Sequence, residues 1–166
     1  MAYCPDCGAA LGDAETCNDL FNRMLALEWE VMAYLGGSVP PEKFPETPGG
    51  ADGLNAHFYA VGTYQLQHPD RLEVAMIHGL RDEIGAMLAG TTTIAETRLR
   101  HRRQFDGPQR VRRRETGRDP ALGPWPDRWP TTVADICVVA VEDYVGAVRR
   151  WAETSLYAIR AVRGKD

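Results

Sequence analysis

Residues 1–17 read MAYCPDCGAALGDAETC, and three of the four cysteines of the chain lie in this stretch. Cys4 and Cys7 are separated by two residues and followed by Gly8, a spacing that predicts a tight turn with both sulfurs directed at one point. Cys17 comes where a helical pattern begins, and a helix N-terminus favours the thiolate form. Three thiolates in this arrangement predict a metal site, with Zn²⁺ as the expected ion because it prefers tetrahedral sulfur and nitrogen donors.

Other uses of these cysteines are less well supported. A redox Cys-x-x-Cys pair normally lies where a strand meets a helix in a βαβ unit, and the surrounding sequence predicts no such unit. Free surface thiols remain an alternative. Cys137 lies among Ile136, Val138 and Val139 and is expected to be a small buried apolar residue.

Length and composition favour one ordinary globular domain. The chain has 166 residues, of which 44% are hydrophobic and 25% charged. It contains no apolar run near the roughly 18–20 residues that a membrane span needs, and its start does not resemble a secretory signal. We therefore expect a cytoplasmic protein without disulfide bonds and without a membrane association.

Apolar residues recur at helical spacing after the cysteine-rich segment. Asp13 or Thr16 can cap a first helix, and Glu28 falls on its apolar stripe, where we expect it to reach solvent at the edge. The stripe consists of Cys17, Leu20, Phe21, Met24, Val31 and Leu35. Residues 38–50 contain four prolines and form a predicted crossover loop.

A second helix is expected to end at Pro69, and a third to begin at a capping box formed by Asp70 and Glu73. The third helix has apolar rows on two sides, which predicts a central position in a bundle. His57, Val61, Tyr64 and His68 share one stripe of the second helix.

The second half of the chain alternates between helical patterns and an irregular stretch. A short polar helix through Ile94 and Leu99 precedes an Arg/Pro-rich excursion, residues 104–130, which Trp125 and Trp129 are expected to anchor. Thr131 or Thr132 opens the last helical region, which is predicted to break at residues 141–143 and to continue as a long amphipathic helix. The fold class is thus all-α: one domain, residues 1–166, with four to five helices and an N-terminal zinc knuckle.

The fourth metal ligand depends on the direction of the second helix. If the first two helices are antiparallel, His68 lies beside Cys17, whereas His57 lies about 16 Å away along the axis. If they are parallel, His57 takes that place, and His78 in the third helix is a further candidate. We favour His68.

The chain resembles an uncharacterised bacterial, mainly actinobacterial, family of unknown function. The matching features are Cys4-Pro5-x-Cys7-Gly8, Cys17, His57, Tyr64-x-x-Gln67-His68-Pro69, His78, Thr132-Val133-Ala134-Asp135 and Trp151-Ala152. The resemblance implies a helical domain with a zinc knuckle and no particular reaction.

Three functions are compatible with these features. The first is a small zinc enzyme acting on a metabolite, with Tyr64, Gln67 and His78 as catalytic candidates beside the metal. The second is a binding or regulatory module in which zinc is purely structural. Nucleic-acid binding through the nine arginines of residues 98–118 is less favoured, because the net charge is −4 and Phe105 is the one stacking aromatic in that run. The sequence does not set an oligomeric state.

Overall fold

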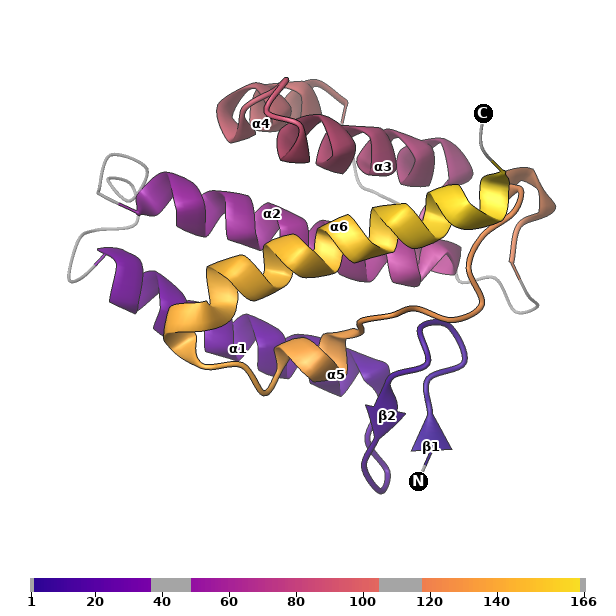
Figure 1. The fold of residues 1–166 in the computed structure, drawn as a ribbon, viewed down its shortest axis with the longest axis horizontal. Helices are drawn as coiled ribbons and strands as arrows, with labels where there is room; N and C mark the ends of the chain where they lie inside the picture. Colours follow the sequence, from indigo (N-terminus) through magenta and orange to yellow (C-terminus); the bar gives the residue numbers. More distant parts are fainter. Residues whose placement is uncertain (1, 37–48, 105–117, 165–166) are drawn as a thin grey trace.

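The computed structural model describes residues 2–36, 49–104 and 118–164, and it is predominantly helical (Figure 1). The described residues form six α-helices: α1 (Cys17–Gly36), α2 (Gly50–Gln67), α3 (Val74–Leu88), α4 (Ile94–Gln104), α5 (Val133–Ile136) and α6 (Tyr144–Arg163). Short 3-10 helices are η2 (Pro69–Arg71), η3 (Pro120–Leu122) and η4 (Val141–Asp143). An N-terminal hairpin pairs the two-residue strands β1 (Ala2–Tyr3) and β2 (Ala10–Leu11). The predicted all-α class is confirmed, with this small hairpin added.

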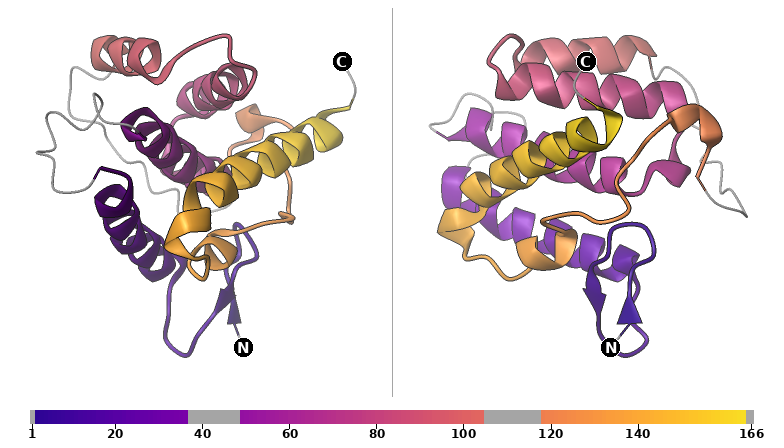
Figure 2. Two further views of the ribbon diagram at one scale, coloured as in Figure 1. Left: turned by 60° about the vertical axis from the view of Figure 1, so that its left-hand side comes forward. Right: turned by 45° about the vertical axis from the view of Figure 1, so that its right-hand side comes forward.

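The helices lie in layers, and α1 and α2 run in opposite directions (Figure 1). Helix α1 starts beside the hairpin, whereas α2 ends there, so the beginning of one lies near the end of the other. Helices α3 and α4 cover the side of α2 that faces away from α1, and α6 crosses the pair obliquely (Figure 2). The antiparallel arrangement on which the choice of His68 depends is therefore present.

Helix α2, not α3, is the central helix. Ten residues of α2 are buried, and the small residues Ala56, Ala60 and Gly62 allow neighbouring helices to approach closely. On α3 four residues are buried, while Val74, Met76 and Leu88 are partly exposed. The prediction that α3 packs centrally was wrong. Two apolar rows on a helix show which faces can be buried, but they do not show how closely another helix can approach. Small side chains, as on α2, determine that distance.

Short-range capping confirms several predicted helix ends. Thr16 and Asp19 cap α1 reciprocally, since each backbone N–H donates to the other's side chain. Thr132 and Asp135 form the same box at α5, and the chain breaks at η4 before α6, as expected. The Asp70–Glu73 box was wrong: residues 69–71 form η2, and Glu73 directly precedes α3.

Glu28 is a buried carboxylate and does not reach solvent, in contrast to the expectation. It is 5% exposed and accepts hydrogen bonds from the Tyr144 hydroxyl at 3.0 Å and from His57 Nδ1 at 2.6 Å. These contacts join α1, α2 and α6. Burial of a carboxylate without hydrogen-bond donors costs free energy, and the donors of Tyr144 and His57 offset this cost at Glu28.

Parts of the expected loops lie outside the described residues. The structure does not describe residues 38–48 of the expected crossover loop or residues 105–117 of the Arg/Pro-rich excursion. In the described part of the excursion, Trp125 and Trp129 are buried, and the Trp125 indole donates to the Leu66 carbonyl at 2.9 Å. The expected anchoring of this segment on the bundle is therefore confirmed. Among the described residues, no helix is both long enough and apolar enough to cross a membrane.

Two helical glycines offer a matched test of packing around α2. A Cβ at Gly62 would lie 2.9 Å from Ile84 Cδ1 and 3.2 Å from Leu80 Cδ1, whereas a Cβ at Gly79 meets nothing within 4 Å. Both substitutions gain helix propensity, but Gly62→Ala also overpacks the core. We expect Gly79→Ala to stabilise by about 0.5–1 kcal/mol and Gly62→Ala to destabilise by roughly 0.5–2 kcal/mol in urea unfolding. Equal effects of the two variants would contradict the close approach of α2 and α3.

The Glu28–His57 pair makes a pH-dependent contribution to stability. The hydrogen bond to Glu28 raises the pKa of His57 above its ordinary 6.5, although burial and the Arg98 charge oppose the rise. A raised pKa stabilises the fold fully below the unfolded-state value, and that stabilisation is lost as pH rises through the folded value.

We therefore expect the difference in unfolding free energy between wild type and His57→Gln to shrink from about pH 6 to about pH 9. Chemical denaturation of both proteins in the same series of buffers measures it, because other pH-dependent contributions then affect both proteins equally. A difference that grows with pH would contradict the ion pair.

Candidate metal centre

The N-terminal hairpin holds Cys4 and Cys7 in a hydrogen-bonded turn. The Cys4 N–H donates to the Ala9 carbonyl and the Gly8 N–H to the Cys4 carbonyl, both at 2.9 Å. Gly8 has φ of 77°, a left-handed conformation that favours glycine. The sulfurs of Cys4 and Cys7 also accept backbone hydrogen bonds, from Cys7 and Ala9 respectively. This local network directs both sulfurs to the inner side of the turn.

Cys17 and His68 are supplied by the meeting ends of α1 and α2. Cys17 is the first residue of α1, and His68 directly follows α2, where Pro69 prevents the helix from continuing. His68 Nδ1 lies 2.7 Å from the Tyr64 carbonyl oxygen. A carbonyl can only accept, so Nδ1 carries the proton and Nε2 is the nitrogen with a free lone pair.

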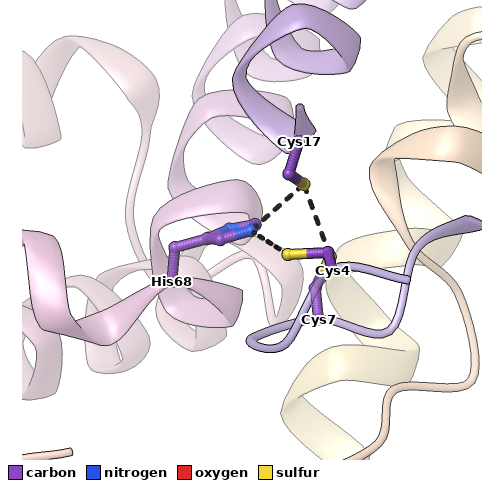
Figure 3. Close-up of side chains that lie close together, drawn as sticks. All are labelled: Cys4, Cys7, Cys17 and His68. Atoms are coloured by element: carbon purple, nitrogen blue, oxygen red, sulfur yellow. Dashed lines mark hydrogen bonds between the residues drawn. The ribbon is translucent and has the colours of Figure 1, made fainter. Parts of the chain in front are cut away.

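These four side chains converge, and we call them the cysteine–histidine group (Figure 3). His68 Nε2 lies 3.2 Å from Cys17 Sγ and 3.6 Å from Cys4 Sγ, and the sulfurs of Cys7 and Cys17 are 3.5 Å apart. All four donor atoms lie within 4.8 Å of one another. Donors in a tetrahedral zinc shell are separated by roughly 3.5–3.8 Å, so little movement is needed to enclose an ion. The group, with every member buried, could hold a metal ion.

The three thiols strongly influence one another's ionisation. Hydrogen bonds from Cys17 and Cys7 lower the pKa of Cys4, and the corresponding hydrogen bond to Cys4 raises the pKa of Cys17. The pKa of Cys7 is raised to about 12, because the contact with Cys4 and burial outweigh the lowering by Cys17. Ionisation of Cys4 thus disfavours ionisation of Cys7 and Cys17, and a divalent ion would compensate the charge of the additional thiolates.

Aromatic packing covers the group on the side of α2. The ring of Tyr64 stacks on Phe21 at 4.1 Å and lies 4.1 Å from the His68 ring, while the Arg71 guanidinium lies 5.3 Å from the Tyr64 ring. Burial raises the pKa of the Tyr64 phenol, and the nearby Cys17 raises it further. Tyr64 is 2% exposed and stays protonated, so it can donate toward sulfur but has little contact with water.

The other two catalytic candidates lie in different surroundings. Gln67 is fully buried, and its amide nitrogen donates to the Thr131 carbonyl at 2.8 Å and to Ser155 Oγ at 3.1 Å. His78 is not part of the cysteine–histidine group. Its ring lies 6.2 Å from that of Trp125, and burial and the Arg163 charge lower its pKa. A catalytic role for Tyr64, Gln67 or His78 remains a prediction.

Sequence reasoning missed a second polar cluster, formed by Glu28, His57 and Tyr144. Its one signal in the sequence was Glu28 itself, which falls between Met24 and Val31 on an apolar stripe. The pairing with Tyr144 joins residues 116 positions apart, which no local pattern predicts. Cys137 is partly buried, and its S–H donates to the Leu20 carbonyl at 3.2 Å.

A family model described as "Family of unknown function (DUF5946)" matches residues 48–160. The chain belongs to this family. The resemblance to a family of unknown function is thereby confirmed. The match includes His68 but begins after Cys4, Cys7 and Cys17, so it does not cover the three cysteines of the group. No curated protein and no solved structure matches the chain.

The geometry predicts which substitutions abolish metal binding. We expect the protein to bind one equivalent of Co²⁺ with the visible absorption typical of tetrahedral cobalt thiolates. Cys17→Ser and His68→Ala should weaken binding by well over tenfold, since even changes around a metal's ligands cost about 10–100-fold.

Cys137→Ser and His78→Ala are matched controls, because each removes a residue of the same type outside the group. Both should retain the spectrum and the stoichiometry. Retention of full binding by Cys17→Ser, or its loss in Cys137→Ser, would contradict the assignment.

Proposed function

We propose that this protein binds one Zn²⁺ ion through the cysteine–histidine group and that the ion is structural. The observation that carries the proposal is the number of donors: three sulfurs and one imidazole nitrogen converge from the hairpin, α1 and α2. Four protein ligands complete a tetrahedral shell, whereas catalytic zinc sites normally retain a position for water or substrate.

Zn²⁺ is favoured over other divalent ions by the donor set. Soft sulfur donors disfavour Mg²⁺ and Ca²⁺, which prefer oxygen, and a compact arrangement of three sulfurs and one nitrogen suits tetrahedral coordination. The hydrogen bond from His68 Nδ1 to the Tyr64 carbonyl further supports metal binding, because such a contact orients the ring and fixes its tautomer.

The surroundings of the group support a structural role over catalysis at the metal. The Tyr64 ring packs between Phe21 and His68, and the amide nitrogen of Gln67 donates to buried acceptors. His78 lies beside Trp125. A metabolite-modifying enzyme at this metal would need a reacting group with access to substrate. Of the functions considered above, the binding or regulatory module therefore fits these surroundings best.

The ion would hold the hairpin in place. Strands of two residues are far below the length that gives a stable isolated hairpin, and Cys4 and Cys7 are buried against the helices. Because an unfolded chain has no such site, metal-binding free energy becomes folding free energy. The joined ends of α1 and α2 would be stabilised by the same contacts.

Metal removal tests this role. We expect chelation to lower the thermal midpoint, equivalent to a loss of several kcal/mol, and to accelerate amide exchange in residues 2–11. X-ray absorption of the Zn²⁺ protein should show three sulfur donors and one nitrogen. Cys17→Ser serves as the control, because its midpoint should not respond to chelator. An oxygen donor in the shell, or a midpoint that chelation leaves unchanged, would overturn the proposal.

A further inference from the structure

A pocket lies between α2 and α4, far from the cysteine–histidine group. Its volume is about 440 Å³, which is within the range of about 300–1,000 Å³ typical of small-molecule sites. Helix α4 lies over the N-terminal half of α2 (Figure 1), and His57 is about 16 Å along α2 from His68. The lining residues are Leu54, His57, Phe58, Ile94, Thr97 and Arg98.

Two basic side chains line this pocket from opposite helices. His57 comes from α2 and Arg98 from α4, and the charge of Arg98 disfavours the protonated form of His57. Within residues 2–36, 49–104 and 118–164, Arg98 forms no ion pair. Among those described residues Arg98 has no acidic partner, and an anion between the two groups would lower the repulsion between Arg98 and protonated His57.

Glu28 determines which ring nitrogen of His57 is available to a ligand. One carboxylate oxygen lies 2.6 Å from His57 Nδ1, and the other accepts from the buried Tyr144 hydroxyl at 3.0 Å. Burial, followed by the Glu28 charge, raises the pKa of Tyr144, so this phenol remains a donor. Because Nδ1 is committed to Glu28, Nε2 is the nitrogen of His57 that remains for a ligand. The side chain is half exposed, unlike that of His68.

Apart from His57, Arg98 and Thr97, the described lining of the pocket is apolar. Leu54, Phe58 and Ile94 line it, so the site is suited to an organic body as well as a charged group. We propose that this pocket binds a small organic anion, a carboxylate or a phosphate monoester, with its charged group between His57 and Arg98 and its nonpolar part against these three side chains. The proposal does not depend on the bound metal.

Titration with matched probes tests the proposal on the protein with its metal bound. The anions are benzoate, phenyl phosphate and inorganic phosphate, and benzyl alcohol is the neutral counterpart. We expect benzoate and phenyl phosphate to shift the His57 ring resonances saturably in ¹⁵N NMR, with phenyl phosphate binding more tightly than inorganic phosphate. No saturable shift with any of the anions, or equal affinity for benzyl alcohol, would overturn the proposal.

Arg98 provides the decisive variant, because it is exposed and its replacement should leave the fold intact. Arg98→Gln should weaken anion binding about tenfold or more, since it removes a charge-assisted contact. Arg149→Gln, an exposed arginine of α6, is the matched control and should bind as wild type. Unchanged affinity in Arg98→Gln, or an equal loss in Arg149→Gln, would refute the site. The zinc content of each variant, measured in parallel, separates this outcome from a failure of the metal proposal.

The pH dependence distinguishes ligand binding from a purely structural ion pair. Glu28, Tyr144 and Arg98 are the ionisable groups that act on His57 or on its partner in the described parts. Benzoate stays ionised near neutral pH, so its affinity should fall as His57 loses its proton. Glu28→Gln should move that midpoint to lower pH, because the partner that favours the charged imidazole is removed. A benzoate affinity that does not depend on His57 protonation would count against the proposal.

Discussion

The contact between His68 and Cys17 joins the end of α2 to the beginning of α1, and the rest of the site depends on it. The two residues are 51 positions apart, yet Nε2 and Sγ lie 3.2 Å from each other. This requires antiparallel helices of similar length and a proline that ends α2 immediately after the histidine. The hairpin can then place Cys4 and Cys7 against the same point, which links three separate segments of the chain.

Two polar clusters lie along the helix pair α1 and α2, and the histidine of each is held in a similar way. In each, a histidine of the α2 stripe has Nδ1 committed to an oxygen, the Tyr64 carbonyl for His68 and the Glu28 carboxylate for His57. Nε2 is thereby left for another partner. The surroundings of the two histidines differ. His68 is buried beside the cysteine sulfurs, whereas His57 is half exposed and lines a pocket together with Arg98. The same ring is thus a candidate metal ligand in one place and, in our proposal, an anion contact in the other.

Local chemistry explains why parts of the fold could be predicted. The capping pairs at Thr16 and Thr132, the break before α6 and the end of α2 at Pro69 all depend on residues within a few positions of one another. The expectations for α3 and for Glu28 failed for a different reason. Burial depends on what lies across the interface, and the partners of Glu28 come from α2 and α6, at separations of 29 and 116 residues.

The sequence by itself determined the ligand types, the helical periods and, through the spacing of Cys4, Cys7 and Cys17, the existence of a candidate metal site. It left three histidines as possible fourth ligands, because a helical stripe places residues on a face without specifying what the face meets. Tertiary structure separates these histidines, since helix direction brings His68 to Cys17 and places His57 beside Glu28 and α4. Which histidine lies beside Cys17 depends on distances between segments far apart in the sequence, and no local sequence pattern encodes these distances.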